Sequence, residues 1–268
     1  MADVPPAADK LRLGGMALAN GLLVHGPTHW AAAIRTKSGD IEVASGRKPR
    51  VPGPVEKLPG ARGVIRMGES MLVIPLVMRA LPAARLPFQN LTVMAAAGGA
   101  ALAGSQLRRR NQGIGGEAMA AAISLVPSLV ALRGGDTAAY HGVEHKAIGA
   151  YEQGADDARE ATKEHDRCGS HLIAPLMAAN LLGVALLRKL PGKHHPAAGS
   201  LVSLTSLGVA VEVFLWSERN SGTFAARALR KPGHELQRLL GTREPSERQL
   251  EVGRAALAEI LAAEGVAA

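Results

Sequence analysis

Tyr140-His141-Gly142-Val143-Glu144-His145-Lys146-Ala147-Ile148-Gly149-Ala150-Tyr151-Glu152 is the stretch around which the chain is organised. It brings two imidazoles and two carboxylates into a chain otherwise rich in Ala, Leu and Gly. In an α-helix each residue turns by about 100°, so His141, His145 and Glu152 fall on one face. The order His141-x-x-Glu144-His145 is the reversed zinc-hydrolase pattern, in which two His bind the metal and the Glu acts on a bound water. Glu152 is a candidate third ligand.

An alternative interpretation of this stretch needs no metal. Short His and Glu patterns arise by chance, and a solvated helix can carry both residue types on one face. Gly142 and Gly149 also weaken a helix by about 1 kcal/mol each relative to Ala. The prediction of a metal site therefore depends on other parts of the chain.

A second polar cluster, His165-Asp166-Arg167-Cys168-Gly169-Ser170-His171, follows later in the sequence. His165, Cys168 and His171 carry donor atoms of the types that bind divalent metals. Both clusters lie in the segment 133–171, between two apolar windows, so we expect a helix and a turn to bring them together at one membrane face. Cys168 is the single cysteine, and an intrachain disulfide is therefore excluded.

The charge of the chain is unevenly spread. Lys and Arg number 31 against 23 Asp and Glu, a net charge of +8 that in a soluble protein would suggest nucleic acid or an anionic surface as partner. Here the basic clusters, Arg108-Arg109-Arg110 and Arg188-Lys189 with Lys193, directly follow apolar windows, as is typical of membrane proteins. Aromatic residues make up 3% of the chain, which argues against base stacking. We do not expect nucleic acid as a partner.

Four apolar windows are candidate membrane spans: 86–107, 113–132, 172–187 and 197–217. Their Ala, Gly and Ser residues suit close helix packing in lipid. Soluble all-α packing is the alternative, because a hydrophobic fraction of 47% is ordinary for a globular protein. Glu117 is expected in the first turn of a helix, whereas Glu212 is either functional within a span or lies at its surface end.

The remaining segments flank this bundle. Residues 1–13 have no apolar stretch of a signal peptide and are expected to be a disordered leader. Residues 14–60 hold short strands, a hairpin turn at Ser38-Gly39-Asp40 and a Pro-rich linker. Residues 61–85 form an amphipathic helix that Pro75 kinks. Residues 218–268 form a helical tail whose amphipathic terminal helix begins with a capping box at Ser246. The predicted fold class is mainly α, a polytopic membrane helix bundle of about four spans with a small N-terminal β-containing module, 86–217 forming the bundle.

The chain resembles the YqhQ-like family of uncharacterised bacterial membrane proteins, which are described as predicted metal-dependent enzymes. The resemblance rests on 140–146 with Tyr151-Glu152, on His165-x-Arg167-Cys168-Gly169, and on terminal segments that include Leu236-Gln237-Arg238, Thr242-Arg243-Glu244-Pro245 and Gln249-Leu250-Glu251-Val252. It implies a several-helix membrane protein with a metal site built from the two central motifs, and Glu212 matches a family Glu near the end of the last span. The chain departs from the family pattern at Met16, Asn20 and His25, where Gln, Glu and Arg are usual. His171 also replaces a residue that is usually apolar or aromatic.

The main hypothesis is a membrane-embedded metal-dependent hydrolase. His141 and His145, with Glu152 or His165, would bind a divalent metal such as zinc, and Cys168 is either a further ligand or a buried thiol. Glu144 would be the general base, and Lys146 or Arg167 would stabilise developing negative charge.

Two rival functions stay open. One is a non-catalytic scaffold or transport-associated protein whose His/Glu/Cys cluster is structural, and the other is an ion transporter that uses Glu212. The expected partners are the lipid bilayer, an unknown substrate and a second copy of the chain. With four spans, the N-terminus, 133–171 and the C-terminal tail lie on one side of the membrane, which we expect to be the cytoplasm.

Overall fold

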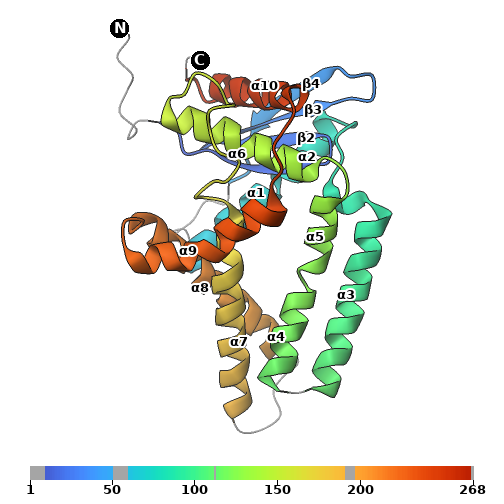
Figure 1. Cartoon of the computed structure of the whole chain (residues 1–268), viewed down its shortest axis with the longest axis vertical. Coiled ribbons are helices and arrows are strands. Elements are labelled where there is room, and N and C mark those ends of the chain that lie inside the picture. The colour runs from blue at the N-terminus through green and yellow to red at the C-terminus, as the bar shows by residue number, and fades with distance from the viewer. Residues whose placement is uncertain (1–9, 51–59, 112, 191–196, 267–268) are drawn as a thin grey trace.

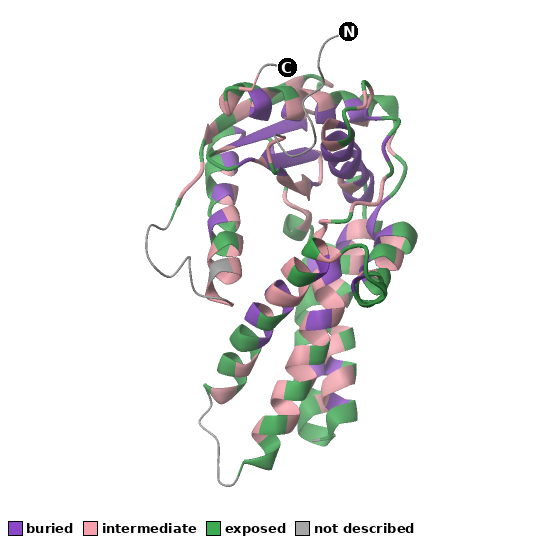
Figure 2. Ribbon diagram, turned by 90° about the vertical axis from the view of Figure 1, so that its left-hand side faces the viewer, coloured by how far each residue is buried: buried purple, intermediate pink, exposed green. Residues whose placement is uncertain are grey.

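The computed structural model describes residues 10–50, 60–111, 113–190 and 197–266. A head and a helix bundle are arranged along the longest axis of the molecule (Figure 1). The head contains the sheet and the helices that cover it, and the bundle extends from its lower end. Buried residues are concentrated in the head, whereas the bundle helices are mostly intermediate or exposed (Figure 2). The predicted fold class, mainly helical with a small N-terminal sheet, is confirmed.

The sheet is an antiparallel meander in the order β1 (Gly14–Leu18), β2 (Gly21–His25), β3 (His29–Arg35), β4 (Ile41–Arg47). Neighbouring strands pair along their whole length, and the predicted turn between β3 and β4 contains Gly39 with φ 101°. A positive φ of this size is readily adopted by glycine, which has no Cβ. Side chains alternate between the two faces of the sheet, as the period of two in a strand requires.

Both faces of the sheet are covered. Leu22, Val24, Ala31 and Ala33 pack with residues of α6 (Thr137–Gln153) and α10 (Glu247–Ala263). The alternating residues Leu23, Ala32 and Ile34 pack against α2 (Val73–Ala80) and the turn that follows it. The sheet therefore forms its core with helices that are distant in sequence.

The predicted amphipathic helix 61–85 is two helices, α1 (Ala61–Met71) and α2, which meet at Leu72. Pro75 stands in the first turn of α2, where its missing N–H leaves no helical hydrogen bond unmade. Glu69 of α1 is buried and forms an ion pair with Arg66 at 2.9 Å. The break at Leu72 lets α2 lie on the sheet while α1 contacts the bundle helix α8 (Ala198–Arg219).

Among the described residues, three helical segments are long and apolar enough to cross a membrane: Ile114–Arg133, Gly169–Lys189 and Ala198–Arg219. They correspond to the predicted windows 113–132, 172–187 and 197–217. The first consists of α4 (Ile114–Ile123) and α5 (Val126–Arg133), and the second of the short 3-10 helix η3 (Gly169–Leu172) and α7 (Ile173–Lys189). The prediction of a membrane protein is supported by these segments.

The remaining window, 86–107, becomes the 3-10 turn η2 (Pro87–Gln89) and the helix α3 (Leu91–Arg110), which is not among these candidates. Asn90 caps α3 by accepting a hydrogen bond from the N–H of Thr92 at 2.8 Å. α3 runs away from the head and α4 and α5 run back to it, just as α7 and α8 form an outgoing and returning pair (Figure 1). The chain leaves the head along α3 and returns to it along α4 and α5. If Ile114–Arg133 crosses a membrane, α3 must therefore cross it in the opposite direction.

Two carboxylates of the bundle have structural partners. Glu117, in the first turn of α4 as predicted, forms ion pairs with Arg108 of α3 at 2.9 Å and with Arg188 of α7 at 3.4 Å. Glu212 Oε1 of α8 accepts a hydrogen bond from the N–H of Gly60, which precedes α1. A carboxylate at a helix N-terminus satisfies an otherwise unpaired backbone donor, so Glu212 joins the bundle to the head.

The chain ends are part of the head. After α9 (Phe224–Leu236) comes a π-helical turn, η4 (Gln237–Gly241), and then α10, which begins with the predicted capping box between Ser246 and Gln249. Residues 10–13 were expected to belong to a disordered leader, whose residues 1–9 lie outside the described part of the chain. Instead Lys10 donates a hydrogen bond to the carbonyl of Tyr151 at 2.6 Å, and Leu13 is buried. The Tyr151 hydroxyl fixes this segment further by accepting from the N–H of Leu11.

Candidate metal centre

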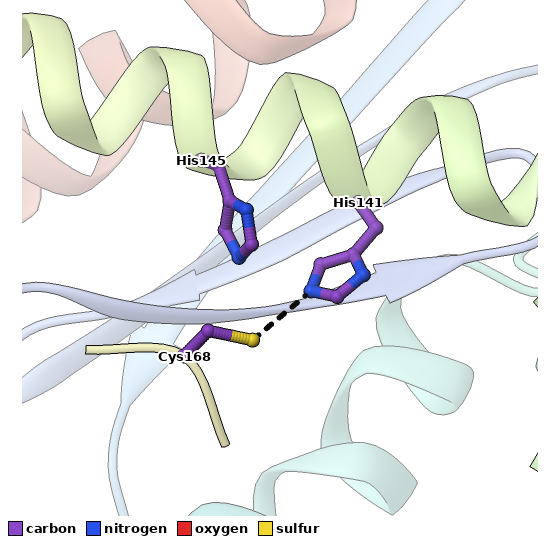
Figure 3. Close-up of side chains that lie close together, drawn as sticks. All are labelled: His141, His145 and Cys168. Carbon is purple, nitrogen blue, oxygen red and sulfur yellow. Dashed lines mark hydrogen bonds between the residues drawn. The ribbon is translucent and has the colours of Figure 1, made fainter. Parts of the chain in front are cut away.

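The helix α6 presents the predicted His/His face to the loop before η3. His141 and His145, one turn apart, point toward Cys168 from that loop (Figure 3). The ligand atoms of these three residues lie within 4.8 Å of one another, and they form the one such group found among the described residues. The two imidazole centroids are 4.3 Å apart, and His141 Nε2 is 3.4 Å from Cys168 Sγ. The structure thus joins the two polar clusters as the sequence predicted.

Backbone carbonyls hold both imidazoles in place. His141 Nδ1 is 2.8 Å from the carbonyl oxygen of Gly241, and His145 Nδ1 is 2.6 Å from that of Lys163. A carbonyl oxygen only accepts, so each Nδ1 carries the proton and each Nε2 keeps a lone pair. Metal-binding His residues typically donate their second ring nitrogen in this way, because the bond fixes tautomer and orientation.

His145 Nε2 is buried and has no hydrogen-bond partner among the described residues. An unpaired buried polar atom normally costs free energy. Burial, and to a smaller extent the neighbouring His141, lower the pKa of the His145 ring to about 2, so the ring is neutral and its Nε2 lone pair stays available. Burial raises the pKa of the Cys168 thiol, which a bound cation would oppose by stabilising the thiolate.

The donor set fits a divalent metal. At the usual Zn–N and Zn–S lengths, a tetrahedral site sets its nitrogen and sulfur ligands about 3.6 Å apart, close to the 3.4 Å between His141 and Cys168. Two imidazoles and a thiolate are ligands that suit zinc. Three protein ligands leave a fourth tetrahedral position for water or substrate, which is the coordination of catalytic rather than structural zinc sites.

Glu144 lies beside the cluster on α6. Its side chain is buried and packs against Gly15 of β1, where an added Cβ would come within 2.7 Å of the Glu144 side chain. Burial raises the pKa of Glu144 to about 7, and the His141 ring partly opposes this increase. Glu144 also lines the same cavity as His141, His145 and Cys168.

The other predicted ligands, Glu152 and His165, pair with each other. His165 Nε2 donates to Glu152 Oε2 at 3.1 Å, and His165 Nδ1 accepts from the N–H of Arg167 at 3.3 Å. Glu152 also forms an ion pair with Arg167. Both ring nitrogens of His165 are thus engaged, and its ring centre is 5.6 Å from that of His145. These residues form a network next to the three-residue cluster and do not contribute ligand atoms to it.

Lys146 and His171 point elsewhere. Lys146 Nζ donates to the carbonyl oxygens of Arg159 and Ala161 at 3.1 and 2.8 Å, and it forms an ion pair with Glu244. These contacts hold the loop after α6, so Lys146 stabilises the head and does not face the cluster. His171 is buried, and its Nδ1 donates to the carbonyl of Arg230 on α9.

Gln237 is a positioning residue to which the sequence assigned no role, although it belongs to one of the segments that carry the family resemblance. It is fully buried in the π-helical turn η4. Its amide donates to Ser170 Oγ at 2.8 Å and accepts from the N–H of His165 at 2.8 Å, so it ties down both ends of the loop that carries Cys168. The same turn supplies the Gly241 carbonyl, and π-helical turns are frequent at functional sites.

The three N-terminal residues that depart from the family pattern have different surroundings in the structure. Asn20 is structural, because it bonds the carbonyl of Arg35 and both the N–H of Arg85 and the carbonyl of Ala83. Met16 and His25 line a cavity of about 600 Å³ that also contains His141, Glu144, His145 and Cys168. The unusual residues at these two positions therefore change the wall of the site.

Comparisons with known proteins concern the half of the chain that carries this cluster. Residues 135–263 match the family model described as "Protein of unknown function (DUF1385)". The chain is 29% identical over 131 residues to the "Uncharacterized protein YqhQ" of Bacillus subtilis (strain 168), a match that covers 47% of this chain and 41% of that protein. No solved structure matches the chain significantly. The matched segment carries α6, the Cys168 loop, Gln237 and α10, and its similarity to YqhQ agrees with the resemblance to the YqhQ-like family that the motifs indicate.

Proposed function

We propose that the chain is a membrane-embedded metal-dependent hydrolase with zinc as its metal. The observation that supports it most strongly is the convergence of His141, His145 and Cys168, where the buried Nε2 of His145 has no hydrogen-bond partner in the described part of the chain. A packed structural cluster would be expected to satisfy that atom. Zinc bound by three protein ligands supplies an acidified water whose pKa is near 7.

The chain's own residues supply the remaining functions of a hydrolase. Glu144 shares the cavity with the ligands and takes up and returns the proton that hydrolysis releases. Arg167 lines the same cavity and offers positive charge to an oxygen that becomes negative during the reaction. Its ion pair with Glu152 holds the guanidinium in position.

Metal analysis of the purified full-length protein tests this proposal. We expect about one equivalent of metal in the unaltered chain and its loss in His145→Ala and Cys168→Ser. His234→Ala, which changes an exposed histidine of α9, is the matched control and keeps its metal. Protein that is folded and metal-free after zinc reconstitution would falsify the proposal.

A second candidate, a non-catalytic scaffold, is favoured by the network of Glu152, His165 and Arg167, which ties the Cys168 loop to α6 without any metal. The variant Glu144→Gln separates the two functions. If the protein is a hydrolase, the Glu144→Gln variant keeps its metal but fails to complement a strain in which the gene for this protein is deleted. Full complementation by the variant indicates a scaffold.

We also propose that the head faces the cytoplasm. The sheet, α6 and α10 form one folded unit, so all three share a side of the membrane. A thiol ligand is best preserved in a reducing compartment. The basic residues 108–110 and 188–189 at the far end of the bundle oppose this orientation. On a Cys168→Ser background, a cysteine at Ser38 should be protected from an impermeant maleimide in intact cells, and one at Leu190 should be labelled. The reverse pattern would place the head outside.

A further inference from the structure

The cavity at the candidate metal centre has a mixed lining that is mostly apolar. Its polar lining includes the ligand residues, Glu144 and Arg167, and also Arg66 of α1. Apolar side chains from four different elements line it as well: Met16, Met67, Phe88, Ala131 and Leu132. A volume of about 600 Å³ is typical of pockets that take small-molecule ligands. A small polar substrate held at the ligand residues would leave these apolar side chains without a contact.

The apolar wall lies at the junction of the head and the bundle. Ala131 and Leu132 belong to the last turn of the candidate span Ile114–Arg133, and the lining residues Gly169 and Ser170 begin the candidate span Gly169–Lys189. Where these segments cross a bilayer, this level is its surface, because both spans end there. The cavity therefore lies next to the lipid boundary.

Exposed apolar side chains continue from the cavity to the outside. Phe88 lines the cavity and is 60% exposed, and Leu91, at the start of α3, is 80% exposed. Such side chains at the membrane boundary offer a hydrocarbon chain a path that avoids water. The cavity therefore joins the ligand groups to an apolar side chain, Phe88, that reaches the surface.

We propose that the ligand of this site is an amphiphile, with a polar group held at His141, His145 and Cys168 and a hydrocarbon chain along the wall of Met67, Phe88 and Leu132. This inference rests on the proposed function, since the polar group is held through the metal. It defines the substrate class as a molecule with one hydrolysable polar end and one alkyl or acyl end. Such a substrate reaches the site from the bilayer rather than from water.

A series of alkyl hydroxamates tests the inference without knowledge of the reaction. The hydroxamate group binds metals, and chains of two, four and six carbons remain in water rather than in detergent. The readout is the visible spectrum of the cobalt-substituted protein during titration. We expect affinity to rise about fourfold for each added methylene, as expected for burial of a methylene group.

Variants of one helix provide the matched control. Met67→Asn changes a residue of the wall, whereas Met71→Asn lies one turn further along α1, is exposed and does not line the cavity. We expect Met67→Asn to flatten the chain-length dependence and leave the affinity for the two-carbon hydroxamate unchanged, and Met71→Asn to behave as the unaltered chain. Phe88→Ser, at a largely exposed position that tolerates a polar side chain, provides a second test.

The outcomes separate the two proposals. If the protein binds cobalt but the affinity is independent of chain length, or Met67→Asn and Phe88→Ser both keep the full dependence, the amphiphile inference is overturned and the metal site stands. If the folded protein binds neither cobalt nor zinc, the proposed function fails and the inference fails with it.

Discussion

In the head, Leu22 and Ile34 are 0% exposed, whereas in the bundle Leu182 and Leu201 are 62% and 64% exposed. The head buries its apolar residues against segments far away in sequence, from the sheet to α6 and α10. The bundle helices contact one another but leave much of their apolar surface outward (Figure 2). The same residue type therefore has a different solvent in the two parts: protein interior in the head and lipid around the bundle. The candidate metal centre lies where these two solvents meet.

Truncation of a leucine to alanine should cause the largest change in unfolding free energy. This change should also differ most between the head and the bundle. Leu22→Ala leaves a cavity in the head and should cost about 2–5 kcal/mol of unfolding free energy. Leu182→Ala should change it by less than about 0.5 kcal/mol, because detergent or lipid refills the space. Unfolding can be followed by the fluorescence of Trp30, which is buried in the head, on a Trp216→Phe background. Equal losses in the two variants would contradict the comparison.

Replacement of helical glycines by alanine should have opposite signs in the two parts. At Gly142 of α6 an added Cβ would lie 2.4 Å from the carbonyl oxygen of Arg243, whereas at Gly98 of α3 it would meet nothing within 4 Å. We expect Gly142→Ala to destabilise the head by about 1–3 kcal/mol through overpacking. Gly98→Ala should stabilise its helix by up to about 1 kcal/mol. Thermal unfolding of both proteins in one detergent measures the difference, and stabilisation by Gly142→Ala would show that the loop after η4, which contains Arg243, can move.

Acidification should weaken the head through His25. Burial, and then the neighbouring Lys48, lower the pKa of His25 from 6.5 to about 4, so the folded head favours the neutral ring. The resulting stability is complete above pH 6.5 and is lost as the pH falls toward 4, by an amount on the order of 3 kcal/mol. The midpoint of urea unfolding, read from Trp30 between pH 7 and 4, measures it. A His25→Gln protein should lose this part of the pH dependence, and an unchanged slope would assign it to other groups.

The smallest effect is expected at the far end of the bundle. Glu117 joins α4 to Arg108 of α3 and Arg188 of α7, and these guanidinium groups are partly exposed. Partly exposed ion pairs contribute about 0–1 kcal/mol and are screened by salt. Glu117→Gln should therefore lower the unfolding temperature slightly at low salt and not at 1 M salt. A large loss at both salt concentrations would indicate that Glu117 is needed for assembly of the two helical pairs.

From the sequence, the helix face on which the site residues lie was predicted better than which of them come together in one cluster. His141 and His145 fall on the expected face, and Cys168 arrives from the expected loop. Glu152 has the right helical phase, yet it lies seven residues beyond His145, about 10 Å along the axis, and so cannot share the same ion. It pairs with Arg167 and His165 instead. Phase specifies a face of the helix, but the rise along the axis decides which residues can meet.

Other features could not be predicted because no local pattern encodes them. The backbone carbonyls of Lys163 and Gly241 fix the imidazoles. Because every residue has a backbone carbonyl, the sequence does not show which ones will do this. α6 and α10 cover the sheet, although bundle helices lie between these segments in the sequence. The kink expected from Pro75 is present as the break at Leu72, but no local pattern shows that it lets α2 lie on the sheet while α1 contacts α8. Spans, turns and the capping box, which depend on neighbouring residues, were found from the sequence.

The position of α10 at the end of the chain has a consequence for the order of biogenesis. About 200 residues separate β4 from α10, which at ordinary rates of translation is roughly 10–40 s. During that time the face of Leu22, Val24, Ala31 and Ala33 is synthesised but lacks its final cover. Both helical pairs are synthesised within this interval. The head can therefore close only after the bundle has been made, and its candidate metal centre is completed only when the π-helical turn before α10 has been made.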